Sequence, residues 1–117
     1  MRQGAWAGQQ LREHMSAELG RNAMRACTVE GEAASCVFEF AGGIQSPISP
    51  ADLCAAQRQA LIFAQKCFAE RLLVQHSGPY LTRVILLPPL TVVQEDLAEI
   101  IARLKQAMQA TAQANCR

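Results

Sequence analysis

The stretch that decides the fold is residues 72–87, which read Leu-Leu-Val-Gln-His-Ser-Gly-Pro-Tyr-Leu-Thr-Arg-Val-Ile-Leu-Leu. Two short runs rich in Val, Ile and Leu, 72–75 and 83–87, flank a Ser-Gly-Pro sequence that is typical of a turn. We therefore expect two neighbouring strands. Pro88 and Pro89 end the second strand, because proline cannot donate a hydrogen bond to a strand ladder.

The part of the chain before this stretch predicts a helix, a strand and a long loop. Apolar residues recur every four positions over 5–19, which predicts a helix with one buried face, and Gly20 is expected to supply a left-handed C-cap. Residues 35–40 alternate so that the cysteine and both phenylalanines share the buried face of a strand. Over 41–50, two glycines and two prolines break both periodicities and predict the main loop.

A second helix is predicted over about 50–70 by the residues at its start. Ser49 supplies an N-cap hydroxyl, Pro50 takes the first helical position, and the Asp52 carboxylate meets the free backbone donors of the first turn. The buried face of this helix is expected to hold seven residues: Leu53, Ala56, Ala60, Leu61, Ala64, Cys67 and Phe68.

The last helix is predicted over about 93–113, where apolar residues repeat at helical spacing and Glu99 stands four residues before Arg103. Together the elements predict an α+β fold in a single domain spanning 1–117. We expect a small, mostly antiparallel sheet with helices packed on one face.

Composition excludes several classes of function. The net charge is +1, the basic residues are scattered and aromatic residues make up 5% of the chain, so we expect no nucleic-acid partner. No apolar run approaches the roughly 20 residues that span a bilayer, so we expect no membrane partner. The five cysteines form no C-x-x-C pair and there are only two histidines, which predicts reduced thiols, no metal site and a cytoplasmic protein.

No set of residues predicts catalysis by this chain alone. Lys66 and Lys105 fall in amphipathic helices, where a lysine is usually a solvated charge. His76 and Ser77 are adjacent, but a Ser-His pair also needs an orienting acid and an oxyanion site. We therefore predict no catalytic, cofactor-binding or metal-ligating residues.

Residues 68–108 resemble the end of class III pyridoxal-phosphate-dependent aminotransferases, most of all diaminobutyrate:2-oxoglutarate transaminases. In that family a helix runs into a strand, a turn, an apolar strand ending in Pro-Pro-Leu-Thr, and a last amphipathic helix. The most specific match is 86–91, Leu-Leu-Pro-Pro-Leu-Thr. Upstream, 29–31 and 37–40 look like the family's glycine-containing joint and the strand after it, so the resemblance covers about residue 9 to the end.

The resemblance implies an isolated C-terminal small domain, or fragment, of such a transaminase. The Schiff-base lysine and the phosphate site of the family lie upstream in a large domain, so the resemblance implies that pyridoxal phosphate belongs to the full-length family and is not bound by this chain alone. Family members often carry a basic residue where Ile85 stands here, and Arg83 alternates onto the same strand face. Arg83 is therefore the candidate substrate-binding residue.

The alternative is a stand-alone, non-enzymatic α+β interaction or dimerisation module derived from that domain. The partner is then a second copy of the chain, whereas the first hypothesis requires an aminotransferase large domain. An exposed apolar patch formed by Trp6, Ile44, Ile48 and Tyr80 is expected to indicate association, because monomers rarely leave such a patch uncovered. A small ligand-binding domain, marked by an enclosed apolar pocket, is a third hypothesis.

Overall fold

The computed structural model describes residues 3–24, 26–44, 47–88 and 92–115, and within them it contains three helices and four strands. In chain order these are α1 Gln3–Arg21, β1 Thr28–Glu30, β2 Cys36–Glu39, α2 Pro50–Ala69, β3 Gln75–Ser77, β4 Arg83–Leu86 and α3 Gln94–Asn115. The strands form one antiparallel sheet in the order β1-β2-β4-β3. The predicted α+β class is confirmed.

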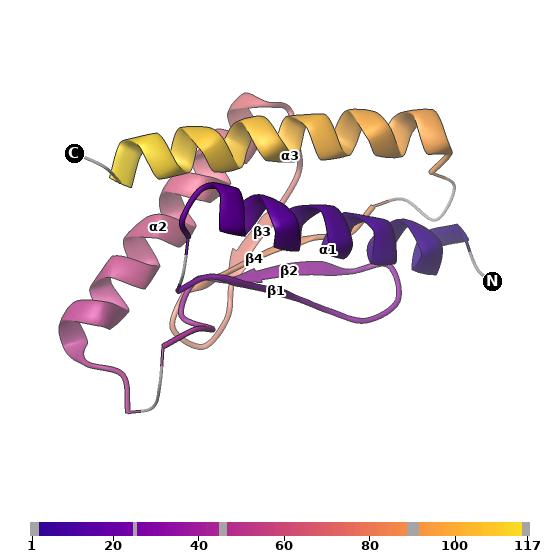
Figure 1. Cartoon of the computed structure of the whole chain (residues 1–117). Coiled ribbons are helices and arrows are strands. Elements are labelled where there is room, and N and C mark those ends of the chain that lie inside the picture. The colour runs from indigo at the N-terminus through magenta and orange to yellow at the C-terminus, as the bar shows by residue number, and fades with distance from the viewer. Residues whose placement is uncertain (1–2, 25, 45–46, 89–91, 116–117) are drawn as a thin grey trace.

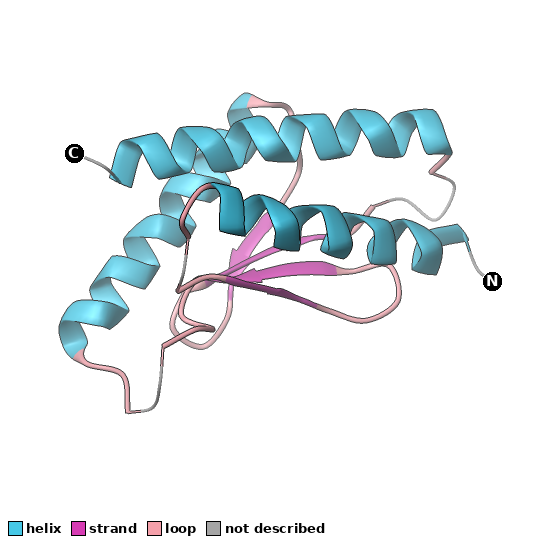
Figure 2. Cartoon of the chain, in the orientation of Figure 1, coloured by secondary structure: helices cyan, strands magenta, loops and turns pink. Residues whose placement is uncertain are grey.

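The helices lie together on one face of the sheet (Figure 1). Helix α1 packs over β1 and β2, α2 packs over β3 and β4, and α3 lies against both helices. The inward side chains of the central strands, among them Cys36, Phe38 and Val84, are fully buried. The outward side chains of the same strands are half-buried or exposed, so the sheet has one covered face and one open face (Figure 2).

The rotation of α2 about its own axis is set by Phe63. Its ring centroid lies 4.8 Å from that of Phe38 and 5.6 Å from that of Phe40, and all three side chains are fully buried. The predicted buried face is wrong on this point, because it included Leu61 and Phe68. With 3.6 residues per turn, these two residues lie roughly 100° around the helix from the buried stripe, and both are exposed.

Helix α1 ends two residues later than predicted, and Gly20 is not its left-handed cap. The amide of Met24 donates to the carbonyl oxygen of Leu19 and the amide of Ala23 to that of Gly20, at 3.0 and 3.3 Å. This is a Schellman motif in which Ala23, with φ 56°, takes the left-handed position. Met24 and Leu19 are both buried, so their apolar contact places the cap at Ala23.

Helix α2 ends in the same motif, which moves the start of the following strand. The amide of Leu72 donates to the carbonyl oxygen of Cys67 at 2.9 Å, and Arg71 has a φ of 64°. Because Leu72 is the buried residue of this cap, the predicted strand over 72–75 is wrong and β3 begins at Gln75. Leu73 is left 87% exposed.

The strand β1 was not predicted, and it forms a hairpin with β2 that α1 covers closely. Val29 pairs with Phe38, and Gly31, with φ 134°, lies in the connection. Arg12 Nη1 of α1 donates to the carbonyl oxygens of Ala33 and Ser35, at 2.9 and 2.7 Å. Three consecutive residues form too short a strand for an alternation pattern to reveal it.

The remaining local predictions agree with the structure where it describes them. The Ser49 hydroxyl accepts from the Asp52 amide at 3.1 Å with Pro50 at the helix start, and β4 ends before Pro88. Arg103 donates to Glu99 along α3. Pro89, Leu90 and Thr91 lie outside the described residues. Of the helices that the structure describes, none is long and apolar enough to cross a membrane.

Gly8 is predicted to be required for the close approach of α1 to the hairpin. A Cβ there would overlap the carbonyl oxygen of Ala33 and lie 2.7 Å from the carbonyl carbon of Ala34. The change Gly8→Ala should therefore lower the free energy of unfolding by about 1–3 kcal/mol, the cost of overpacking. Chemical denaturation measures this effect directly.

Gly20→Ala is the matched control, because a Cβ at Gly20 meets nothing within 4 Å. This variant should gain up to about 1 kcal/mol from the higher helix propensity of alanine. Equal effects of the two changes would contradict the packing of α1 described above.

Candidate interaction surface

The predicted substrate-binding residue, Arg83, lies on the open face of the sheet in an ion pair. Its Nε is 2.7 Å from Oε2 of Glu39, its partner in the β2–β4 register, and Oε1 of Glu39 accepts from the Thr82 hydroxyl at 2.7 Å. The guanidinium is thus already neutralised within the chain. A role in binding a substrate carboxylate stays a prediction.

The surroundings of Lys66 do not fit a pyridoxal-phosphate site. The hollow beside it is otherwise lined by Ala110, Gln113 and Ala114, none of which offers a carboxylate for the pyridine nitrogen or a hydroxyl for the phosphate. Lys105 lies on α3, half-buried. Among the described residues that line this hollow, none gives Lys66 an acidic partner or a phosphate cradle.

The buried cysteines are part of the core. Burial raises the pKa of Cys27, Cys36 and Cys67 to about 12, because the thiolate is poorly solvated among apolar side chains. Such thiols are poor nucleophiles near neutral pH. Cys54, in contrast, is exposed on α2.

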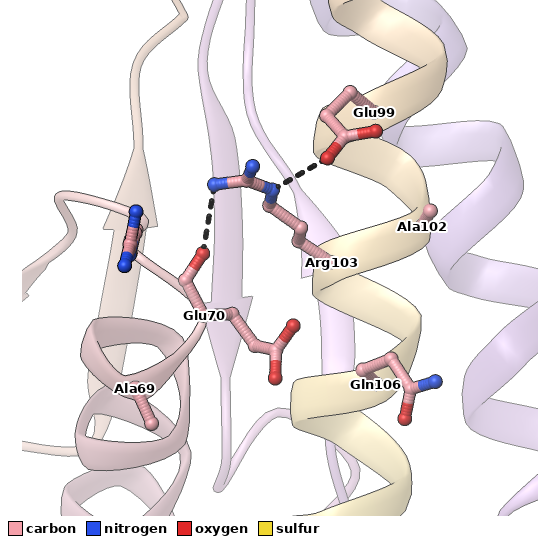
Figure 3. A pocket seen from close by; sticks show the side chains of 7 residues that line it. Ala69, Glu70, Glu99, Ala102, Arg103 and Gln106 are labelled. Atoms are coloured by element: carbon pink, nitrogen blue, oxygen red, sulfur yellow. Dashed lines mark hydrogen bonds and ion pairs between the residues drawn. The ribbon is translucent and has the colours of Figure 1, made fainter.

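The cleft between the end of α2 and the middle of α3 is a structural junction. It has a volume of about 440 Å³ and is lined by Ala69, Glu70, Arg71, Glu99, Ala102, Arg103 and Gln106. Arg103 reaches across it, donating from Nε to Glu99 at 2.9 Å and from Nη1 to the Glu70 carbonyl oxygen at 3.1 Å (Figure 3). Arg103 therefore caps the C-terminal end of α2 and links α3 to α2.

The most distinctive surface of the chain is apolar. Among the described residues, seven large hydrophobic side chains are exposed: Leu61, Phe68, Leu73, Tyr80, Leu81, Leu87 and Val93. Single exposed hydrophobic residues are common on protein surfaces, whereas a group of them indicates a contact with something else.

Three residues of α2 form a straight line along its outer side. Cys54, Leu61 and Phe68 follow one another at intervals of seven, which corresponds to about two helical turns, and all three are exposed. Leu61 and Phe68 are 47% and 52% exposed. We call Cys54, Leu61 and Phe68 the α2 stripe.

The α2 stripe borders the open edge of the sheet. Helix α2 packs on β3, and Gln57 of α2 donates to the Tyr80 carbonyl oxygen at 2.8 Å, in the turn after β3. Exposed apolar residues also lie near both ends of β3 along the chain, with Leu73 before the strand and Tyr80 and Leu81 after it. We call the α2 stripe and these three residues together the association face.

The patch predicted from the sequence is different, and only Tyr80 of its four residues is exposed. Trp6 packs against the core, and Ile44 and Ile48 are half-buried. The sequence analysis missed the exposure of Leu61 and Phe68, although the sequence holds a signal for it. Three alanines four apart, at 56, 60 and 64, mark the side of α2 that lies closest to the sheet, and Leu61 and Phe68 lie off that side.

Comparisons with known proteins add no relative. No family model matches the chain, and the searches of curated proteins and of solved structures found no match.

The reactivity of the thiols tests their placement. In a Cys116→Ser chain, which removes the one cysteine outside the described residues, Cys54 should be the one thiol that reacts quickly with Ellman's reagent in dilute solution at pH 8. The other three should react only after unfolding, because at pH 8 they lie far below a pKa of about 12. Rapid reaction of a second thiol in the folded chain would contradict the core described here.

Proposed function

We propose that this chain is a non-enzymatic dimerisation module that binds a second copy of itself through the α2 stripe. The observation that carries the proposal is the exposure of Leu61 and Phe68 on a helix whose opposite side is locked into the core by Phe63. Water contact with these side chains is unfavourable, and burying one such side chain completely is worth about 1.5–3 kcal/mol.

The stripe is complementary to itself. Leu61 lies midway between Cys54 and Phe68, seven residues from each. A two-fold axis through Leu61 therefore sets the two α2 helices antiparallel, with Leu61 against Leu61 and each Phe68 against Cys54 of the other copy. Such an axis is the symmetry of most homodimers.

The charges beside the stripe permit this arrangement. Arg58 and Gln65 flank it, and the same axis brings Arg58 of one copy beside Gln65 of the other, so no like charges meet. The net charge of the chain is only +1, so long-range repulsion between two copies is weak.

A second candidate is the aminotransferase small domain that the sequence resembles. It is favoured by the connection of β4 to the last helix through Leu86, Leu87 and Pro88, the described part of the Pro-Pro-Leu-Thr match. In that case the association face would be the contact with a large domain, and the chain on its own would not dimerise.

The change Leu61→Arg is predicted to dissociate the dimer. Leu61 lies on the proposed axis, so the variant places two guanidinium groups opposite each other in an apolar contact. Sedimentation equilibrium should give twice the chain mass of 12.7 kDa for the unmodified protein and the single mass for Leu61→Arg. Phe68→Arg should have the same effect.

Val93→Arg is the matched control, because Val93 is 44% exposed just before α3 and lies outside the association face. It should leave the dimer intact. A single-chain mass for the unmodified protein at every concentration would contradict the proposed function and favour the second candidate. Dissociation by Val93→Arg alone would show that a different surface is used.

A further inference from the structure

We infer that the two copies also join their β3 strands edge to edge, so that one continuous antiparallel sheet crosses the dimer axis. This inference rests on the proposed dimer and adds a second contact to the α2 stripe. This second contact would be made by the backbone of Gln75, His76 and Ser77, which the α2 contact does not involve.

Strand β3 is a short open edge that carries none of the residues that usually prevent pairing. It bonds to β4 on one side and is the last strand of the sheet on the other. Edge strands that must stay single are often very short, as β1 and β3 both are, or carry lysine, proline or inward-pointing charges. The three residues of β3 are all uncharged and none is proline, whereas β1, at the opposite edge, ends in Glu30.

The antiparallel geometry explains the exposed residues at both ends of β3. If the axis passes through His76, Gln75 of one copy lies opposite Ser77 of the other, and all three residues pair. The same axis brings the residues before β3 in one copy near the turn that follows β3 in the other copy, so Leu73 would approach Tyr80. Leu73 is 87% exposed and Tyr80 62% exposed in one chain, and this pairing covers both at once.

The strand contact and the helix contact are compatible with one axis. Helix α2 lies over β3 and β4 on the covered face of the sheet. Neighbouring strands are about 4.8 Å apart, so the two α2 helices of a joined sheet would run about 10 Å apart. This is the usual separation of packed helices. Both contacts are antiparallel, as one two-fold axis requires.

Amide hydrogen exchange of the full chain tests the inference. The amides of residues 75–77 that do not bond to β4 should exchange at least about tenfold more slowly in concentrated protein than in protein diluted until it dissociates. The same amides should lose this protection in Leu61→Arg. Amides of β1, the other edge, serve as the internal control and should exchange equally in all samples.

The outcomes separate the inference from the proposed function. A dimer mass without concentration-dependent protection of residues 75–77, or with protection at β1 instead, would overturn the strand pairing and leave the α2 contact standing. A single-chain mass at all concentrations would overturn both. Comparison with diluted unmodified protein keeps the test valid if Leu61→Arg fails to fold.

Discussion

The contact of Phe63 with Phe38 and Phe40 is the constraint on which the rest of the structure depends. It joins α2 to the centre of the sheet through three fully buried rings, with the centroid of Phe63 4.8 and 5.6 Å from those of the other two. Tilted aromatic pairs at such distances contribute about 0.5–1.5 kcal/mol beyond the burial of their area. Once Phe63 faces the sheet, the rotation of α2 is fixed, and Leu61 and Phe68 must face outward.

The way the helices end has a comparable influence on the surface. Both α1 and α2 close with a Schellman motif whose left-handed residue is not glycine, Ala23 in one case and Arg71 in the other. Each motif buries the residue that follows, Met24 or Leu72. At α2 this leaves Leu73 exposed and shortens β3 to three residues, so the cap of a helix shapes the edge of the sheet.

Much of the fold was predictable because its signals are local. The Ser49 cap, the alternation over Cys36 to Phe40 and the repeat in α3 each depend on neighbours within a few residues. The short β1 strand and the exact start of β3 depend on pairing partners far along the chain, which alternation over three residues does not reveal. The association face was missed for a related reason: periodicity gives α2 one broad apolar face, and only the contact with the sheet decides which part of that face is buried.

The proposed dimer gives a single purpose to three features that are otherwise unconnected: the α2 stripe, the open β3 edge and the exposed residues at the two ends of β3. Helix α2, which carries the stripe, packs over β3. The proposed two-fold dimer would cover them together.

The most direct measurement is an isotope-filtered NOE experiment on a mixture of labelled and unlabelled chains, which detects protons close together in different copies. The proposed dimer should give intermolecular signals between the Phe68 ring and the Cys54 β protons, and between Leu61 methyl groups. Intermolecular signals confined to other residues, such as Val93, or none in concentrated protein, would contradict it.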